Sequence, residues 1–288
     1  MIAHRGSIEV EVDGKPVGEC EGSLRISGED VFVVPRGSIS VGEDPVLESV
    51  GSSFSSAELE SGSFTPPRSR VVLTPPTAAA LVAHGITVKR FEVEGSLVLT
   101  TLGGPSLYPF ERRILVPEGE LTLRFVPKNP EAVRGSLLSA ANRVLDRSVA
   151  SLARGRAVRI CRMRVTAGGE RGSGTLRVVP REDTFLLLLQ PEEDELKEVL
   201  REAVDRPQLG MALTAPEAAS LASGDAVLRH GKGELTLTLD VREYPELRAE
   251  GEGLRLRAVP SSIPAAIAGQ ELLRRAAEAF VREVVGEE

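Results

Sequence analysis

The stretch Leu73-Thr-Pro-Pro-Thr-Ala-Ala-Ala-Leu81 recurs in the second half of the chain as Leu213-Thr-Ala-Pro-Glu-Ala-Ala-Ser-Leu221, with six identical residues in nine positions. In both copies a short apolar segment ends at Thr-x-Pro, and an alanine-containing run follows. A threonine side chain can cap a helix, and proline is favoured in the first helical turn. Each copy therefore predicts a strand that leads directly into a helix.

Shorter blocks around this stretch repeat in the same order. Residues 22–25 match 174–177, residues 29–32 match 182–185, residues 95–100 match 233–238, and residues 121–127 match 254–260. Because the blocks are collinear and their offset drifts slowly, we predict a tandem duplication. The predicted repeats are residues 1–153 and 154–288.

Hydrophobic periodicity predicts the elements within each repeat. Apolar and polar residues alternate from Ile8 to Val12, which is typical of a half-buried strand. Apolar residues at helical spacing close each copy, around Leu137 in the first and Leu273 in the second. We predict an α+β fold in which each half is an antiparallel sheet with helices on one face, the halves being related by a pseudo-two-fold axis.

The two copies diverge in one region. The second copy predicts a helix over residues 191–204, with a proline and acidic residues in its first turn. The first copy has instead residues 38–63, rich in serine and acidic residues, which favour an acidic loop or an irregular edge.

Composition excludes several classes of protein. The 288 residues are 41% hydrophobic, enough for a sizeable core, but only 3% aromatic with no tryptophan, which excludes a base-stacking platform. Three histidines and two cysteines without ligand spacing predict no metal site, no disulfide framework and no cofactor. No apolar run approaches the roughly 18 residues of a membrane span, so we expect a cytoplasmic protein without a membrane partner. The 30 arginines against 5 lysines, with few Asn and Gln, indicate a thermophile.

Three motifs suggest chemistry, and none predicts a catalytic residue. Cys20 lies in Gly-Glu-Cys-Glu-Gly, the spacing of a nucleophile elbow, but no helix follows and we expect a hairpin turn. The glycine-rich residues 168–174 precede a strand rather than a helix with a lysine, so we predict a hairpin loop instead of a phosphate loop. His84 and His230 each precede a glycine, and we expect surface or capping roles for them.

Charge is distributed unevenly along the chain. Residues 143–181 hold ten arginines and two acidic residues and carry +8, whereas the whole chain carries −7. The candidate residues for binding an anion or nucleic acid are Arg154, Arg156, Arg159, Arg162 and Arg164. Arg162 and Arg164 lie two apart on a predicted strand and so share a face. The alternative is neutralisation within the chain by residues 182–205, which hold nine acidic residues.

Part of the first copy resembles a known family. Residues 121–142 resemble the small dimerising subunit of the KEOPS tRNA-modification complex, which implies a role in scaffolding. The element order is similar to that of the TATA-binding protein saddle and of helix-grip ligand-binding folds. Such fold-level likenesses do not transfer function.

The sequence thus predicts an interaction or scaffold protein rather than an enzyme. Its expected partners are another protein or a second copy of the chain, with nucleic acid as a candidate for the arginine tract. The alternative is a small-molecule-binding protein or enzyme with a site at the interface of the two halves.

Overall fold

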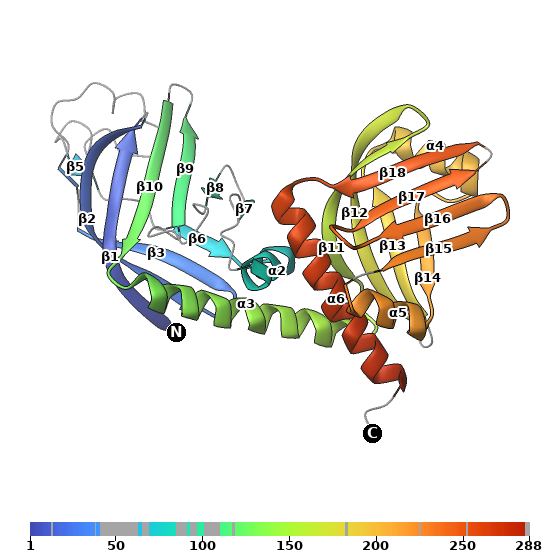
Figure 1. Ribbon diagram of the computed structural model, residues 1–288. Helices are drawn as coiled ribbons and strands as arrows, with labels where there is room; N and C mark the ends of the chain where they lie inside the picture. Colours follow the sequence, from blue (N-terminus) through green and yellow to red (C-terminus); the bar gives the residue numbers. More distant parts are fainter. Residues whose placement is uncertain are drawn as a thin grey trace. The chain divides into compact units, whose positions relative to one another are not determined.

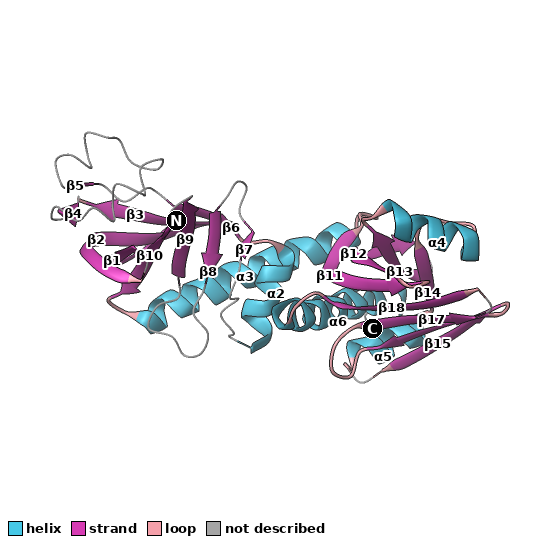
Figure 2. Cartoon of the chain, turned by 90° about the horizontal axis from the view of Figure 1, so that it is seen from above, coloured by secondary structure: helices cyan, strands magenta, loops and turns pink. Residues whose placement is uncertain are grey.

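The computed structural model describes residues 1–12, 14–37, 39–40, 63–64, 69–84, 91–92, 97–100, 110–116, 119–181, 184–224, 226–251 and 253–285. These residues form two eight-stranded antiparallel sheets, a two-stranded pair and five helices (Figures 1 and 2). The predicted α+β class is therefore confirmed. None of the described helices has the length and apolar character that crossing a membrane requires.

The first sheet has the strand order β6-β3-β2-β1-β10-β9-β8-β7. Its strands are β1 (Ile2–Val12), β2 (Lys15–Ser27), β3 (Asp30–Arg36), β6 (Ser69–Val72), β7 (Phe91–Glu92), β8 (Leu97–Thr100), β9 (Phe110–Val116) and β10 (Gly119–Pro127). The separate pair is β4 (Ile39–Ser40) and β5 (Ser63–Phe64). Most of the predicted loop over residues 38–63 lies outside the described residues.

The second sheet has the strand order β14-β13-β12-β11-β18-β17-β16-β15. Its strands are β11 (Val158–Ala167), β12 (Glu170–Arg181), β13 (Thr184–Pro191), β14 (Leu209–Leu213), β15 (Val227–Lys232), β16 (Leu235–Asp240), β17 (Glu246–Gly251) and β18 (Leu254–Pro260). Two four-stranded meanders join where β11 pairs with β18, as β1 pairs with β10 in the first sheet. The two sheets thus share one strand order.

Five described helices accompany the sheets. They are α2 (Pro75–His84), α3 (Pro130–Leu152), α4 (Asp194–Val204), α5 (Ala215–Ala222) and α6 (Ile263–Val285). The chain divides into two compact units, residues 1–74 with 85–143 and residues 75–84 with 144–288. The second unit therefore includes α2, which packs on α6 and β11, while α5 packs on α6 and β13. The predicted repeat boundary at residues 153/154 stays a prediction about the sequence.

The core of the second unit lies between its sheet and α6. Met163 and Val165 on β11 are buried, and the rings of Phe185 and Phe280 lie 5.5 Å apart. Gly269 lets α6 approach β11 closely, because a Cβ atom at this position would lie 3.0 Å from Sγ of Cys161. Helix α4 also contacts β11, β12 and β13, and its buried residues are Leu196 and Leu200.

Two local predictions were wrong. The helix predicted from residue 191 begins at Asp194, because Pro191 ends β13 and the backbone N–H of Ser173 donates to Glu193, 2.7 Å away. Cys20 lies inside the long strand β2 rather than in a hairpin turn. Gly22 supports that strand by leaving room for Ile8 on β1, whose Cγ1 atom would lie 2.7 Å from a Cβ.

Candidate anion-binding surface

Strand β11 brings three of the five predicted arginines onto one face. Arg162 and Arg164 alternate with the buried residues Met163 and Val165, as the period of a strand requires. Arg159 would point the opposite way in a regular strand, since it lies three residues before Arg162. A register shift between Arg159 and Cys161 adds one residue, and this bulge returns Arg159 to the exposed face.

Neighbouring strands add four more arginines to this face. Arg171 and Arg177 on β12 are paired with Thr166 and Arg159 of β11, and Arg257 on β18 is also paired with Thr166. Arg255 lies two residues before Arg257 and is exposed as well. Directly paired residues of antiparallel strands project from the same side of a sheet. We call this surface the arginine face; it consists of Arg159, Arg162, Arg164, Arg171, Arg177, Arg255 and Arg257.

Arg159 and Arg177 are direct cross-strand partners of like charge. Such a pair is destabilising by a few tenths of a kcal/mol up to about 1 kcal/mol unless an anion lies between the two groups. Among the described residues neither arginine has an ion-pair partner. The sheet therefore holds two arginines as cross-strand neighbours on its exposed surface with no ion pair among the described residues, although Arg159 is near enough to Glu192 to help lower the pKa of that carboxyl.

A second like-charge pair on the same sheet does have its counter-charge. Arg248 on β17 is paired with Arg257 on β18, and Oε1 of Glu246 accepts from Nε of both, at 2.7 and 2.8 Å. Burial alone would raise the pKa of Glu246, whose side chain is 8% exposed, but these two hydrogen bonds lower it. In this second pair, one buried carboxylate neutralises both arginines.

Glu192 supplies one carboxylate to the arginine face. Its Oε2 atom accepts from Arg162 Nη2 at 3.0 Å and from the Ser173 hydroxyl at 2.8 Å. The hydrogen bond from Ser173 is the largest influence that lowers the pKa of Glu192; burial opposes it, and Arg162 adds to the lowering. Arg162 is thus partly neutralised, as the alternative interpretation predicted.

Three other acidic residues of the predicted neutralising segment, Glu193, Asp194 and Glu198, have different partners. Glu193 accepts from the backbone and hydroxyl of Ser173, at 2.7 and 2.8 Å. Asp194 pairs with Lys197 at 2.7 Å, and Glu198 pairs with Arg201 within α4. Residues 182–183 lie outside the described part of the chain. Within the described part, Glu192 is the one acidic residue of this segment in an ion pair with the arginine tract.

The remaining predicted residues, Arg154 and Arg156, do not belong to the sheet. They lie in the turn between α3 and β11, where Gly155 has a positive φ of 74°, and both are exposed. Conversely, the sequence prediction missed Arg255 and Arg257 as members of the surface. Their alternation with Leu254 and Leu256 was visible, but nothing local placed β18 beside β11.

The first sheet presents different chemistry at the corresponding place. Its strand β1 carries Glu9 and Glu11, and Nη1 of Arg124 on β10 lies 3.6 and 3.4 Å from their carboxylates. On β2, Glu19 is paired with Glu9. The first sheet thus presents carboxylates on β1, where the second sheet presents arginines on β11, although the two sheets share one strand order.

The described cysteines and the glycine-rich turn show no sign of a reactive site. Cys161 is buried, which raises its pKa to about 12, and burial also raises the pKa of Cys20. Gly168 and Gly169, both with positive φ, form the predicted hairpin turn, but residues 170–174 belong to β12 rather than to a loop. The side chain of His84 lies outside the described residues. Within the described ranges, no three His, Cys, Asp or Glu side chains gather as metal ligands.

Comparison with known proteins adds no assignment. No protein-family model matches the chain, and no curated protein matches it either.

Proposed function

We propose that this protein is a non-enzymatic interaction protein that binds nucleic acid through the arginine face. The observation that carries the proposal is the cross-strand pair of Arg159 and Arg177, neither of which is in an ion pair among the described residues, and Arg164 on the same face has none either. A phosphate between two guanidinium groups would remove their repulsion and form charge-assisted hydrogen bonds. Arginine is suited to this role because its planar donors can hold phosphate in a bidentate manner.

The proposed contacts are with the phosphate backbone rather than with bases. The chain has no tryptophan and few other aromatic residues, so stacking can contribute little. Arg162 and Arg164 are about 7 Å apart along β11, given the rise of a strand. A flat array of arginines at such spacing favours binding with little dependence on sequence and strong dependence on salt.

A titration of labelled single-stranded RNA and double-stranded DNA tests the proposal. We expect binding at low salt that weakens as salt rises, and a triple variant Arg159→Gln, Arg164→Gln, Arg177→Gln should lower the salt slope by about 2 to 3. The matched control is Arg134→Gln, Arg206→Gln, Arg282→Gln, which removes the same charge from exposed positions elsewhere. Absence of binding at low salt, or equal losses in both triple variants, would overturn the proposal.

We also propose that the chain arose by tandem duplication. The collinear sequence blocks and the common strand order of the two sheets support this proposal. The pseudo-two-fold relation, the thermophilic source, the cytoplasmic location and a protein or homo-oligomeric partner stay predictions. So does the alternative of a small-molecule or catalytic site at the interface of the halves.

A further inference from the structure

The eight strands of the second unit follow one another in a ring that lacks one pairing. The first meander ends at β14, α5 connects it to β15, and the second meander returns to pair β18 with β11. Strands β14 and β15 are the two edges of the sheet and do not pair with each other. Every other neighbouring pair in this ring is hydrogen-bonded.

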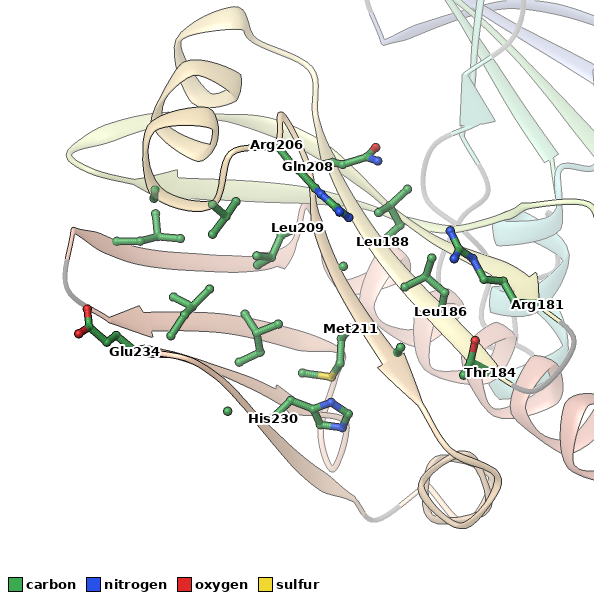
Figure 3. A pocket seen from close by; sticks show the side chains of 18 residues that line it. Arg181, Thr184, Leu186, Leu188, Arg206, Gln208, Leu209, Met211, His230 and Glu234 are labelled. Carbon is green, nitrogen blue, oxygen red and sulfur yellow. The ribbon is translucent and has the colours of Figure 1, made fainter.

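A cavity of about 820 Å³ lies at this opening (Figure 3). Both edges contribute to its lining, β14 through residues 209–212 and β15 through His230 and Gly231. The buried residues Leu209, Met211, Leu237 and Leu254 give the cavity an apolar wall. The volume is within the range of sites that hold a ligand of several hundred daltons.

The edge strand β14 is not protected against pairing. Its sequence Leu-Gly-Met-Ala-Leu has no charged residue and no proline, the usual means of blocking an edge. Its outward positions are Gly210 and Ala212, which cover little of the backbone. Because β14 bonds to β13 on one side, alternate N–H and C=O groups of β14 point toward the open side.

These backbone groups determine the chemical class of ligand. A hydrocarbon that filled the cavity would cover them without replacing their hydrogen bonds to water, which costs free energy for each group. An extended peptide would pair with them and place every second side chain against the apolar wall. The geometry therefore favours a peptide over a lipid-like ligand.

Charge at the rim defines the peptide further. Arg181 and Arg206 both line the cavity, and among the described residues neither has an ion-pair partner (Figure 3). Arg181 lies on the exposed face of β12, the side to which Gly210 and Ala212 also point. Side chains on the outer side of an added strand would lie on this same side.

We propose that the opening between β14 and β15 binds an extended peptide segment of a partner protein by strand addition to β14. The segment alternates apolar residues, which face Leu209 and Met211, with acidic residues, which pair with Arg181 and Arg206. Arg177 is the cross-strand partner of Leu188, which lines the cavity, but none of Arg159, Arg164 and Arg177 lines it, and the proposed peptide contacts do not depend on these three arginines.

The test uses NMR titration of the full chain with a blocked hexapeptide of three Glu-Val repeats. We expect shift changes at residues 209–213 and a dissociation constant of about 1 mM or below. Two further peptides carry N-methyl groups, one at the valine amides and the other at the glutamate amides. A strand bonds through one edge, so one methylated peptide should lose binding and the other should retain it.

Protein variants locate the binding site. Gly210→Glu fits the fold, because a Cβ there meets Leu186 Cδ1 at an ordinary 3.4 Å, and its carboxylate should weaken peptide binding about tenfold by repulsion. Arg181→Glu with Arg206→Glu should weaken binding at least as much. The control with the same charge change, Arg134→Glu with Arg282→Glu, should have little effect. A thermal melt of each variant checks that it folds.

Several outcomes would overturn the proposal. They are no shift at β14 with any of the peptides, equal binding of both methylated peptides, or equal weakening by the control pair. Displacement of the peptide by dodecanoate, with dodecanoate itself binding more tightly, would assign the cavity to an apolar acid instead. The triple variant at Arg159, Arg164 and Arg177 should still bind the peptide, so a failure of the nucleic-acid proposal leaves this one intact.

Discussion

Nη2 of Arg162 donates to Oε2 of Glu192 at 3.0 Å, joining the middle of β11 to the residue that follows β13. Two residues further along the same face, Arg164 has no ion-pair partner among the described residues. One strand thus presents one arginine that is held by a carboxylate and one that is available to an anion. The proposed nucleic-acid surface can therefore be tested by removing the carboxylate of Glu192.

Removing the carboxylate should strengthen binding to nucleic acid. Glu192→Gln removes the ion pair that Glu192 makes with Arg162 and takes one negative charge from the arginine face, so we expect affinity at low salt to rise about threefold. The free energy of unfolding should fall by only about 0.5 kcal/mol, because an ion pair that is exposed to solvent contributes little to stability. Fluorescence anisotropy with the labelled RNA measures the first effect, and urea unfolding measures the second.

Glu202→Gln is the matched control for this prediction. It removes the same charge from an exposed position on α4 that has no ion pair with an arginine of β11 among the described residues. If Glu202→Gln strengthens binding as much as Glu192→Gln, the gain reflects net charge and not the local pair.

Two helical glycines should respond in opposite ways to alanine. Gly135 on α3 has nothing within 4 Å of an added Cβ, so Gly135→Ala should stabilise the protein by about 1 kcal/mol through helix propensity. Gly269→Ala should destabilise it, because the new Cβ would lie 3.0 Å from Cys161 Sγ and 3.1 Å from Pro245 Cγ. Urea unfolding of both variants measures the difference. A stabilising Gly269→Ala would show that α6 does not pack as closely on β11 as described.

The sequence predicted individual strands and helices, but it predicted much less about which strands lie beside one another. Alternation predicted the strand that carries Arg162 and Arg164, and the Thr-x-Pro stretch predicted the helix that begins after Thr214. Alternation could not show that Arg159 shares their face, because this depends on a bulge that leaves no local signature in the sequence. It also could not bring Arg255 and Arg257 beside β11, since that pairing joins distant parts of the chain.

The acidic residues 182–205 also show that a count of charges does not predict which side chains pair. Counting charges in residues 182–205 offered neutralisation of the arginine tract as the alternative; Glu192 does pair with Arg162, whereas Asp194 and Glu198 pair with Lys197 and Arg201 within α4. Pairs three residues apart on a helix are local and form readily.

The resemblance of residues 121–142 to a KEOPS subunit is not supported by the comparison with family models, none of which matches the chain.

The two thiols should be unreactive in the folded protein. Thiolate is the nucleophile, and the pKa of Cys161 is raised to about 12 by burial, so its thiolate fraction at pH 8 is about 1 in 10,000. Cys20 is buried as well. Ellman's reagent should react with both thiols at least about 100 times faster after unfolding in guanidinium chloride. Rapid reaction of either thiol in the native protein, assigned with Cys20→Ala and Cys161→Ala, would contradict its burial.

Glu217 should contribute stability that is lost in acid. Its Oε2 accepts from the backbone N–H and hydroxyl of Thr214, each at 2.8 Å, and its Oε1 lies 2.8 Å from Nε2 of His230. Burial would raise the pKa of Glu217, but these hydrogen bonds outweigh it and lower the pKa.

A carboxyl with a lowered pKa stabilises the fold above its unfolded pKa, which is about 4.3, and this contribution disappears as pH falls through the folded pKa. Glu217→Ala should therefore cost about 1 kcal/mol at pH 7, and its difference from the wild type should shrink below about pH 4. Urea unfolding at both pH values checks this, with Glu202→Ala as the control; a loss for Glu217→Ala that is independent of pH would mean that the carboxylate charge plays no part.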